Sequence, residues 1–260
     1  MDVLPLELIQ YMFDYLIFKD QINLKSLSKN YYHSLRIYDL YNIPEKYKDK
    51  LSDEILKNYS YIKYLDVSNN SNIKNINNLF NLQKLTAGRL CYDCKINDND
   101  IKNLNLIELS IYNSDITNLN HLTNLKKLTI QNIKSKISNE GIKNLNLEEL
   151  CLFNDFDNKI TNLSHMINLN HMTNLKILYI YFGCQINDEC IEDLNLEELY
   201  LYVNCKSDNK ITNLNHMTNL KKILVFSWKF EYIPNVEKLK NFNLKGLKLS
   251  KGNGYYQLSN

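Results

Sequence analysis

A short apolar pattern recurs along most of this 260-residue chain and limits the folds that it can adopt. The pattern is Leu-x-x-Leu-x-Leu, with Ile, Val or Ala at some positions, and its first residues are Ile62, Leu82, Leu106, Leu125, Leu147, Leu175, Leu196, Leu220 and Leu244. Successive starts are 20, 24, 19, 22, 28, 21, 24 and 24 residues apart. A period of about 20 to 50 residues is typical of proteins built from stacked repeats, so we expect a solenoid.

The second half of each unit is also regular, because an Ile precedes the next start at a fixed distance. The distance is 9 residues from Ile73, Ile116 and Ile211, and 10 residues from Ile96, Ile137 and Ile186. The two kinds alternate, which indicates that the evolutionary unit is a pair of repeats. The long spacing of 28 arises from a tandem copy, residues 164–169 beside residues 170–175.

The apolar alternation in the first half of each unit predicts a strand that pairs in parallel with the equivalent strand of its neighbour. The Leu side chains point into a shared core, and the second, fourth and sixth residues after each start lie on the concave face. The second halves return along the convex side as short helices or turns. An Asn precedes most starts, and we expect it to form a turn into the strand, because Asn tolerates a left-handed backbone and hydrogen-bonds to its own backbone. These residues are Asn81, Asn105, Asn124, Asn146, Asn174, Asn195, Asn219 and Asn243.

Over about residues 60–250 this pattern resembles the leucine-rich-repeat family. The segments 137–142 and 186–191 look like the cysteine-containing repeat class, in which Cys184 and Cys205 would occupy the ladder position after the strand. The alternating Thr-Asn-Leu-Asn-His-Met-Thr-Asn-Leu segments look more like the repeats of bacterial surface proteins. The resemblance implies an α/β solenoid, a horseshoe of about nine repeats with a parallel concave sheet.

The residues before the repeats predict three short helices. Met12, Phe13, Leu16 and Ile17 follow Pro5 at helical spacing, which indicates an amphipathic first helix. We expect Asp20 to cap a second helix and a third helix to begin at Asn30.

Four motifs in this segment match a known pattern at its usual spacing. They are Leu4-Pro5-Leu6-Glu7, then Tyr15-Leu16 before Asp20-Gln21-Ile22-Asn23-Leu24, then Leu27-Ser28-Lys29. Together they resemble the F-box over about residues 2–36. The chain departs from that pattern near its end, where Tyr31 or Tyr32 stands in place of the usual Trp.

The F-box resemblance implies that the N-terminal helices dock on the small adaptor subunit of a cullin-type, SCF-like ubiquitin ligase, while the repeats capture a protein substrate. If the family's contacts apply to the matching positions of this sequence, the adaptor is bound by Leu4, Pro5, Leu8, Ile9, Leu16, Leu24 and Leu27. The alternative is a helical cap on a repeat scaffold that binds proteins and has no ligase role. The face of Leu4, Pro5 and Leu16 distinguishes the two, because it is accessible in a receptor and buried against the first repeat in a cap.

Strand alternation places aromatic residues in neighbouring strands on the concave face. These residues are Tyr112, Phe153, Tyr179, Tyr181, Tyr200, Tyr202 and Phe226. Aromatic side chains are frequent anchors of protein interfaces, so we expect this face to bind a partner. The competing explanation is that Tyr suits strands and is abundant in proteins from AT-rich genomes. The second positions Glu108, Lys127, Glu149, Glu198 and Lys222 alternate partly in sign, which indicates cross-strand pairing.

Candidate chemistry is sparse. Cys91 and Cys94 have metal-like spacing, but zinc needs four ligands and Cys184 belongs to a unit about 20 Å away. Free thiols are therefore expected. His121, His171 and His216, and His165 in the tandem copy, occupy one repeat slot, which favours packing or solvation over catalysis. No nucleophile arrangement or phosphate-binding Gly loop is present. We therefore expect that the protein is not an enzyme and that it binds no metal and no cofactor.

The charge is balanced, with 31 Lys and Arg against 29 Asp and Glu, so no bulk field favours nucleic acid or an anionic membrane. The sequence lacks a basic, apolar start and an apolar run of about 20 residues, which favours an intracellular, cytoplasmic protein, in host cytoplasm if the genome is viral. We expect four parts: an F-box-like module (1–40), a helical linker or cap (41–60), the solenoid (61–250) and a C-terminal tail (251–260). Trp228 and residues 229–243 are expected to belong to a C-terminal cap.

Overall fold

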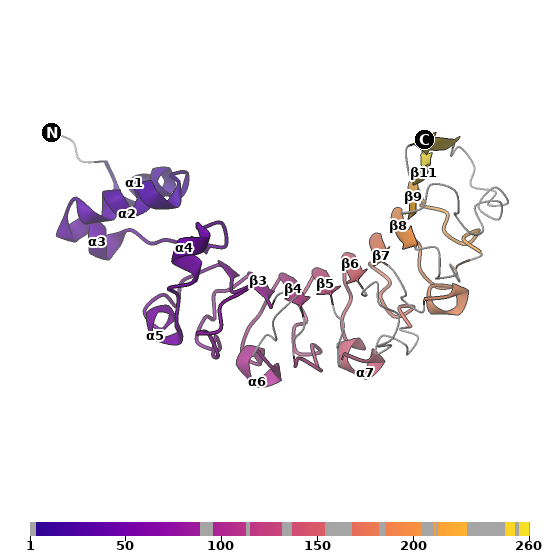
Figure 1. The fold of residues 1–260 in the computed structure, drawn as a ribbon, viewed down its shortest axis with the longest axis horizontal. Coiled ribbons are helices and arrows are strands. Elements are labelled where there is room, and N and C mark those ends of the chain that lie inside the picture. Colours follow the sequence, from indigo (N-terminus) through magenta and orange to yellow (C-terminus); the bar gives the residue numbers. More distant parts are fainter. Residues whose placement is uncertain are drawn as a thin grey trace.

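The computed structural model describes residues 4–88, 96–112, 115–131, 137–153, 168–181, 186–203, 211, 213–227, 248–252 and 255–259. These residues form a curved solenoid with a group of helices at its N-terminal end (Figure 1). Outside this described part lie Cys91, Cys94, Cys184, Cys205, His165, Trp228, residues 229–243 and the last start of the apolar pattern, Leu244.

 The predictions made above for these cysteines, for this histidine and for a C-terminal cap all concern residues outside the described ranges.

Three helices form the N-terminal module, as the spacing of apolar residues predicts: α1 (Leu6–Asp14), α2 (Phe18–Ser26) and α3 (Lys29–Ser34). The predicted cap of the second helix is wrong, and the third helix begins at Lys29, one residue before the predicted Asn30. Helix α2 begins after Ile17, so Asp20 lies in its first turn. Ser28 caps α3, because its side chain accepts a hydrogen bond from the backbone N–H of Tyr31 at 3.1 Å.

The chain enters the solenoid through β1 (Asp39–Leu40), α4 (Glu45–Lys48) and α5 (Asp53–Leu56). Strand β1 pairs in parallel with the first strand of the repeats, β2 (Tyr64–Asp66). The sequence pattern does not predict β1, because it precedes the first complete copy of the apolar pattern. Phe13, Leu35 and Ile37 are buried in the same apolar cluster as the repeats, so the core continues from the helical module into the solenoid.

The repeats contribute one strand each to a single sheet. After β2 come β3 (Lys84–Ala87), β4 (Glu108–Tyr112), β5 (Lys127–Gln131), β6 (Glu149–Phe153), β7 (Ile177–Tyr181), β8 (Glu198–Val203) and β9 (Lys222–Ser227). Every neighbouring pair from β1 to β9 is parallel. The predicted parallel concave sheet is therefore confirmed for the repeats that begin at residues 62 to 220.

The C-terminal end differs from the prediction. Strand β10 (Lys248–Gly252), from the repeat that starts at Leu244, is antiparallel to β11 (Tyr255–Ser259), and β11 is antiparallel to β9. The ninth copy therefore does not extend the parallel ladder. Residues 255–259, expected in a tail, insert as a strand between β9 and β10, because a short hairpin reverses the chain direction.

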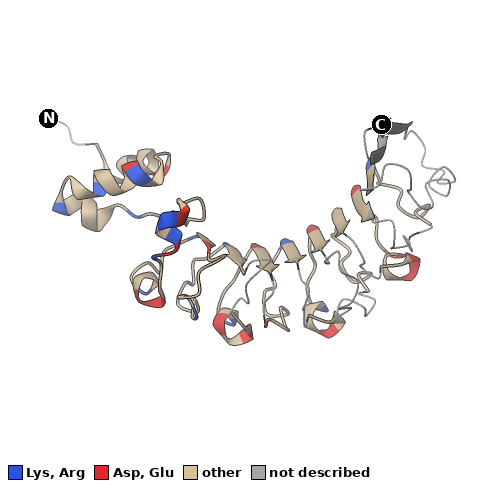
Figure 2. Cartoon of the chain, viewed as in Figure 1, with Lys and Arg blue, Asp and Glu red and all other residues tan. Residues whose placement is uncertain are grey.

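Burial alternates along the strands as the period of two predicts. In β4, Leu109 and Ile111 are buried, while Glu108, Ser110 and Tyr112 are partly exposed. The convex side carries α6 (Asp98–Ile101), α7 (Asn139–Ile142) and the 3₁₀ helix η2 (Asp188–Cys190). Acidic residues stand in the first turn of each of these short helices (Figure 2).

An Asn-His pair on the convex side links each of several repeats to both neighbours. Asn120 Nδ2 donates to the carbonyl oxygen of Glu140 at 2.6 Å, and its Oδ1 accepts from the backbone N–H of Asn144 at 2.8 Å. In the opposite direction, His121 Nε2 lies 3.0 Å from the carbonyl oxygen of Ile101. The same links recur between Asn170 and Glu189, Asn170 and Asp193, His171 and Ile142, and His216 and Ile191.

The asparagines before the starts from Leu82 to Leu220 do not use the left-handed backbone that Asn tolerates. Among the described residues, Asn69 is the one non-glycine residue with a positive φ, at 70°. The asparagines instead form contacts between repeats: Asn124 Nδ2 donates to Asn105 Oδ1 at 3.0 Å, and Asn146 Oδ1 accepts from the backbone N–H of Asn174 at 2.9 Å. Stacking of the repeats brings equivalent side chains of neighbouring repeats within hydrogen-bonding distance. The sequence of a single repeat does not reveal these contacts.

Candidate functional site

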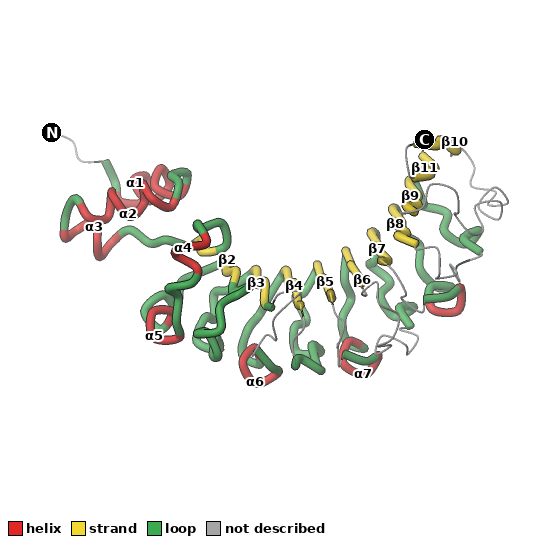
Figure 3. Tube along the Cα trace, in the orientation of Figure 1, coloured by secondary structure: helices red, strands yellow, loops and turns green. Residues whose placement is uncertain are grey.

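Six of the predicted concave residues belong to strands β6 to β9. These strands lie along the inner curve of the solenoid (Figure 3). We call this set the aromatic face: Phe153, Tyr179, Tyr181, Tyr200, Tyr202 and Phe226. Strand register pairs them in two rows. One row runs from Phe153 through Tyr181 and Tyr202 to Phe226, and the other pairs Tyr179 with Tyr200.

The rings of the aromatic face stack on one another. The centroids of Tyr181 and Tyr202 are 3.9 Å apart with planes 8° from parallel, and those of Tyr202 and Phe226 are 4.5 Å apart at 10°. Tyr179 and Tyr200 stack at 4.4 Å and 14°. Phe153 tilts by 34° against Tyr181 at 4.8 Å. Because neighbouring rings cover one another, the inner rings of the row expose mainly their edges and hydroxyl groups.

Tyr112, also predicted for this surface, is set apart from the aromatic face. Its register partner on β5 is Gln131, and Gln131 pairs with Phe153. Two strand spacings, about 10 Å, therefore separate Tyr112 from Phe153. Strand alternation also places Cys151, Ile177 and Leu224 on the same face, although they are not among the residues predicted to bind a partner.

Polar groups border the aromatic face at Tyr200. The Tyr200 hydroxyl donates to a carboxylate oxygen of Glu198 and accepts from Lys222 Nζ at 2.9 Å. Burial, the hydrogen bond to Glu198 and its negative charge raise the pKa of Tyr200 to about 12. Burial and the neighbouring Tyr200 raise the pKa of Tyr179 to about 12 as well. Both hydroxyls are therefore neutral at physiological pH and act as hydrogen-bonding groups.

At the other end of the concave face, the chain covers its own surface. Lys48 of α4 forms an ion pair with Asp66 of β2 at 2.5 Å. Thr86 of β3 donates to the Tyr41 hydroxyl at 3.1 Å, and Lys84 Nζ lies 4.6 Å from the centroid of the Tyr41 ring. A hollow of about 440 Å³ remains beside this segment. The segment with Tyr41 and Lys48 therefore covers part of the concave surface of strands β2 and β3.

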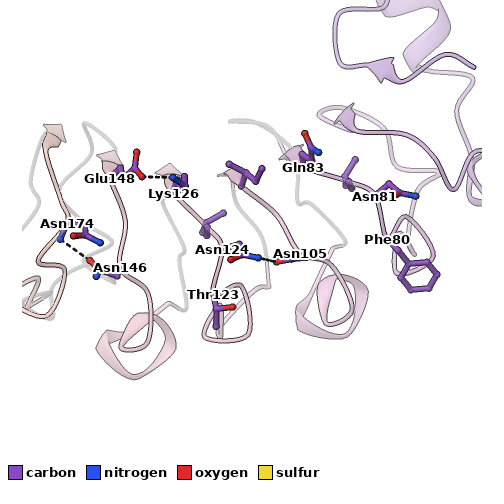
Figure 4. A pocket seen from close by; sticks show the side chains of 13 residues that line it. Phe80, Asn81, Gln83, Asn105, Thr123, Asn124, Lys126, Asn146, Glu148 and Asn174 are labelled. Carbon is purple, nitrogen blue, oxygen red and sulfur yellow. Dashed lines mark hydrogen bonds and ion pairs between the residues drawn. The ribbon is translucent and has the colours of Figure 1, made fainter. Parts of the chain in front are cut away.

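A second hollow, of about 520 Å³, follows the edge where strands β3 to β7 begin (Figure 4). Asparagines of successive repeats line it, together with Lys126 and Glu148, which form an ion pair at 2.7 Å. The asparagine contacts between Asn124 and Asn105 and between Asn174 and Asn146 lie along this edge. Its polar groups hydrogen-bond to neighbouring repeats, which gives it a structural role.

The residues predicted for adaptor binding divide into two groups. Leu4, Leu8, Leu16 and Leu27 are exposed, with 51%, 45%, 38% and 73% of their surface accessible, and Pro5 is exposed as well. Ile9 and Leu24 are half-buried and pack against the core cluster. Five of the seven residues are therefore accessible to solvent, and the other two stabilise the module.

Further exposed apolar residues extend this surface. On α1, Tyr11 and Met12 are exposed, as is Tyr15 directly after the helix, while Phe13 between them is fully buried. The 3/4 spacing of residues 8, 11, 12 and 15 was available in the sequence and marks one outward face. Exposed Ile17, Ile22 and Tyr32 complete the set. We call the exposed residues Leu8, Tyr11, Met12 and Tyr15 the outer face of α1.

The remaining candidates for chemistry have structural contacts. His121, His171 and His216 hydrogen-bond to carbonyl oxygens of the preceding repeat, which replaces the predicted packing or solvation with a defined link. Because a carbonyl group only accepts, Nε2 carries the proton in each. Cys151 and Cys190 are free thiols. Within the described ranges, no three His, Cys, Asp or Glu side chains gather in a way that could hold a metal ion.

The repeated apolar pattern, the parallel concave sheet and the helices on the convex side together define the architecture. The fold is a leucine-rich-repeat-like solenoid. No protein-family model and no curated protein matches the sequence. In the described part of the chain, no helix is long and apolar enough to cross a membrane.

Solved structures of two bacterial proteins are similar to this one. An internalin from Listeria monocytogenes matches at 19% identity and a TM-score of 0.36, over 70% of this chain and 58% of that chain. A leucine-rich-repeat protein from Leptospira interrogans matches at 18% identity and a TM-score of 0.34, over 84% of this chain and 62% of that one. This chain therefore spans less than two thirds of the length of either protein.

Proposed function

We propose that this protein is a non-enzymatic repeat scaffold that binds a protein partner on its concave face. The observation that supports the proposal most is the alignment of six aromatic side chains on four neighbouring strands. Aromatic side chains supply large contact areas at a small cost in conformational entropy, and they are enriched among the residues that dominate binding energy. Their mutual stacking holds them in place before a partner arrives.

A selection of displayed small protein domains on the immobilised, intact protein tests this proposal. We expect most selected domains to lose at least tenfold in affinity for the Tyr202→Ala variant, because Tyr202 stacks on both of its neighbours in the row. Phe80→Ala is the matched control, since Phe80 is 64% exposed and is not part of the aromatic face. Circular dichroism establishes that both variants fold. Selected domains that bind the Tyr202→Ala variant unchanged would contradict the proposal.

A second candidate function is that of a substrate receptor in a cullin-type ubiquitin ligase. The exposed outer face of α1 favours it: Met12 is 56% exposed and Tyr15 is 74% exposed, whereas Phe13 is fully buried. A helix that serves only as a cap buries its apolar side chains against the first repeat, so apolar residues on both faces favour a further partner.

Purified cullin adaptor subunit is the probe for this second function. We expect the intact chain to bind it, and a Leu8→Glu/Met12→Glu variant to lose binding, because the charges replace exposed apolar contacts without entering the core. The adaptor pattern itself is tested by a Leu4→Ala/Pro5→Ala variant. Tyr202→Ala is the control that leaves the helices intact. Absence of binding by the folded, intact chain would eliminate the ligase role and leave the scaffold function.

A further inference from the structure

The second positions of the strands form a row of charged residues beside the aromatic face. From β3 to β9 the row contains Lys84, Glu108, Lys127, Glu149, Ile177, Glu198 and Lys222. Two neighbouring pairs in it are ion pairs, Lys84 with Glu108 at 3.0 Å and Lys127 with Glu149 at 2.9 Å. Basic and acidic residues thus alternate from strand to strand as far as β6.

The alternation breaks at Ile177. Strand β7 has this apolar residue where the pattern requires a basic one, so Ile177 stands between Glu149 on β6 and Glu198 on β8. The two acidic positions are two strand spacings apart, about 10 Å. Glu149 uses Oε2 in its ion pair with Lys127, and Glu198 uses Oε2 for the Tyr200 hydroxyl. The row is therefore locally acidic around Ile177.

The neighbouring strands show how a cation sits on this surface. Lys222 Nζ lies 5.0 Å from the centroid of the Tyr200 ring and donates to its hydroxyl, and Lys222 occupies the row position one strand further on. For Tyr179 the corresponding position on the next strand is Glu198. Tyr179 thus has a carboxylate on that strand and another, Glu149, on the preceding strand, and both charges contribute to its raised pKa after burial and Tyr200.

We propose that the partner places an arginine or lysine side chain between Glu149 and Glu198, beside Ile177 and the Tyr179 hydroxyl; this inference rests on the proposed protein-binding role of the concave face. The two carboxylates attract a cation, Tyr179 offers a hydrogen-bond acceptor, and Ile177 packs against the aliphatic part of the side chain. The same carboxylates repel the phosphates of nucleic acid. The partner is therefore a protein segment with a basic residue flanked by apolar ones.

The decisive variant is Ile177→Lys, because it restores the strand-to-strand alternation with a cation from the chain itself. The new lysine stands between two acidic residues, an arrangement that stabilises parallel neighbours by cross-strand pairing. It also occupies the proposed cation site and repels a partner cation. Ile177→Met is the matched control, since Met is an unbranched and flexible side chain like Lys but carries no charge.

The probe is a library of short random peptides, selected on the intact protein and then measured individually against each variant. We expect the selected peptides to be enriched in Arg or Lys beside apolar residues. We expect their affinity to fall at least tenfold for the Ile177→Lys variant, to fall for Glu198→Gln, and to change less than threefold for Ile177→Met. Higher salt is expected to weaken binding to the intact protein, because screening reduces charge attraction.

The outcomes separate this inference from the proposed function. Selected peptides without basic residues, or with equal affinity for the Ile177→Lys variant, would overturn the cation site. If such peptides still lose affinity for the Tyr202→Ala variant, the concave face binds protein and only the cation site is wrong. If they bind both variants as tightly as the intact protein, both the cation site and the concave binding function fail.

Discussion

Single side chains on the convex side hold neighbouring repeats together. Asn120 bonds to two backbone groups of the following repeat, and His121 bonds to a carbonyl oxygen of the preceding one. The Asn-His dipeptide thus contacts both neighbours, so one such unit links three successive repeats. In a solenoid, stability depends on such interfaces between adjacent repeats.

We expect Asn120→Ala to lower the free energy of unfolding by about 1 to 2 kcal/mol, because it removes two hydrogen bonds and leaves their backbone partners to water. Asn103→Ala is the matched control: Asn103 is exposed, and it contributes its backbone N–H to Asn77 Oδ1 at 3.4 Å. Urea unfolding measures both variants. An Asn120→Ala variant as stable as the Asn103→Ala variant would show that these links contribute little.

Asp98 makes stability depend on pH in the acidic range. Burial raises the pKa of its carboxyl group, but hydrogen bonds from Thr117 and Asn118 outweigh burial, so the pKa lies below its ordinary value. The backbone N–H groups of Thr117 and Asn118 donate to Oδ1 at 2.8 Å and 3.1 Å, and the Thr117 hydroxyl donates to Oδ2 at 2.5 Å. The native state therefore favours the charged form.

A carboxyl group with a lowered native pKa stabilises the fold above its unfolded pKa of about 4, and this contribution disappears as the pH falls through the native value. We expect the unfolding free energy to fall over this range, and to fall less steeply in an Asp98→Asn variant. Urea unfolding at several pH values measures the unfolding free energy of the intact protein and of the variant. Asp193→Asn is the control, because Asp193 is exposed and contributes its backbone N–H to Asn170. Identical pH profiles for the intact protein and Asp98→Asn would exclude this contribution.

The short convex helices pack closely against the preceding return segment, and α7 depends on a glycine to do so. A Cβ atom at Gly141 would lie 2.1 Å from the backbone carbonyl oxygen of Thr117. The carbonyl of Gly141 also accepts from the backbone N–H of Leu119 at 2.8 Å, so the two segments are joined at this point. Backbone atoms cannot move aside as a flexible side chain does.

We expect Gly141→Ala to destabilise the protein by about 1 to 3 kcal/mol, since α7 must shift away from residues 117–119. Glu140→Ala, next to it on the same helix, is the control and should change the stability by less than about 0.5 kcal/mol. Thermal and urea unfolding measure both. Equal stability of the two variants would mean that α7 adjusts without cost.

Strands β4 to β9 were predictable because burial of one face imposes a period of two on the sequence. The same period places Tyr181 and Tyr202 on the concave face, as observed. The asparagine contacts were not predictable, since they depend on the spacing between repeats. The insertion of β11 between β9 and β10 was not predictable either, because the apolar pattern does not show which strand pairs with which. The F-box resemblance predicted Leu8 as an adaptor contact but not Met12, because the exposure of Met12 depends on how α1 packs.

At the scale of the whole molecule, the outer face of α1 and the aromatic face lie on different parts of a curved chain. The N-terminal helices stand at one end, and β6 to β9 lie toward the other (Figure 1). Strands β2 to β5 separate them, and the segment with Tyr41 and Lys48 covers the first of these strands. Repeats contact mainly their neighbours, so a change at one end reaches the other only through several intervening units.

We therefore expect Met12→Glu and Tyr202→Ala to act independently. Their effects on the unfolding free energy should add within about 0.5 kcal/mol, because residues far apart with no shared contacts do not couple. Met12→Glu should also leave the affinity of concave-face peptides unchanged within about twofold. The two single variants and the double variant, measured by urea unfolding and peptide binding, form the complete cycle. A coupling energy above about 1 kcal/mol would show that the solenoid transmits changes from the helical module to the concave face.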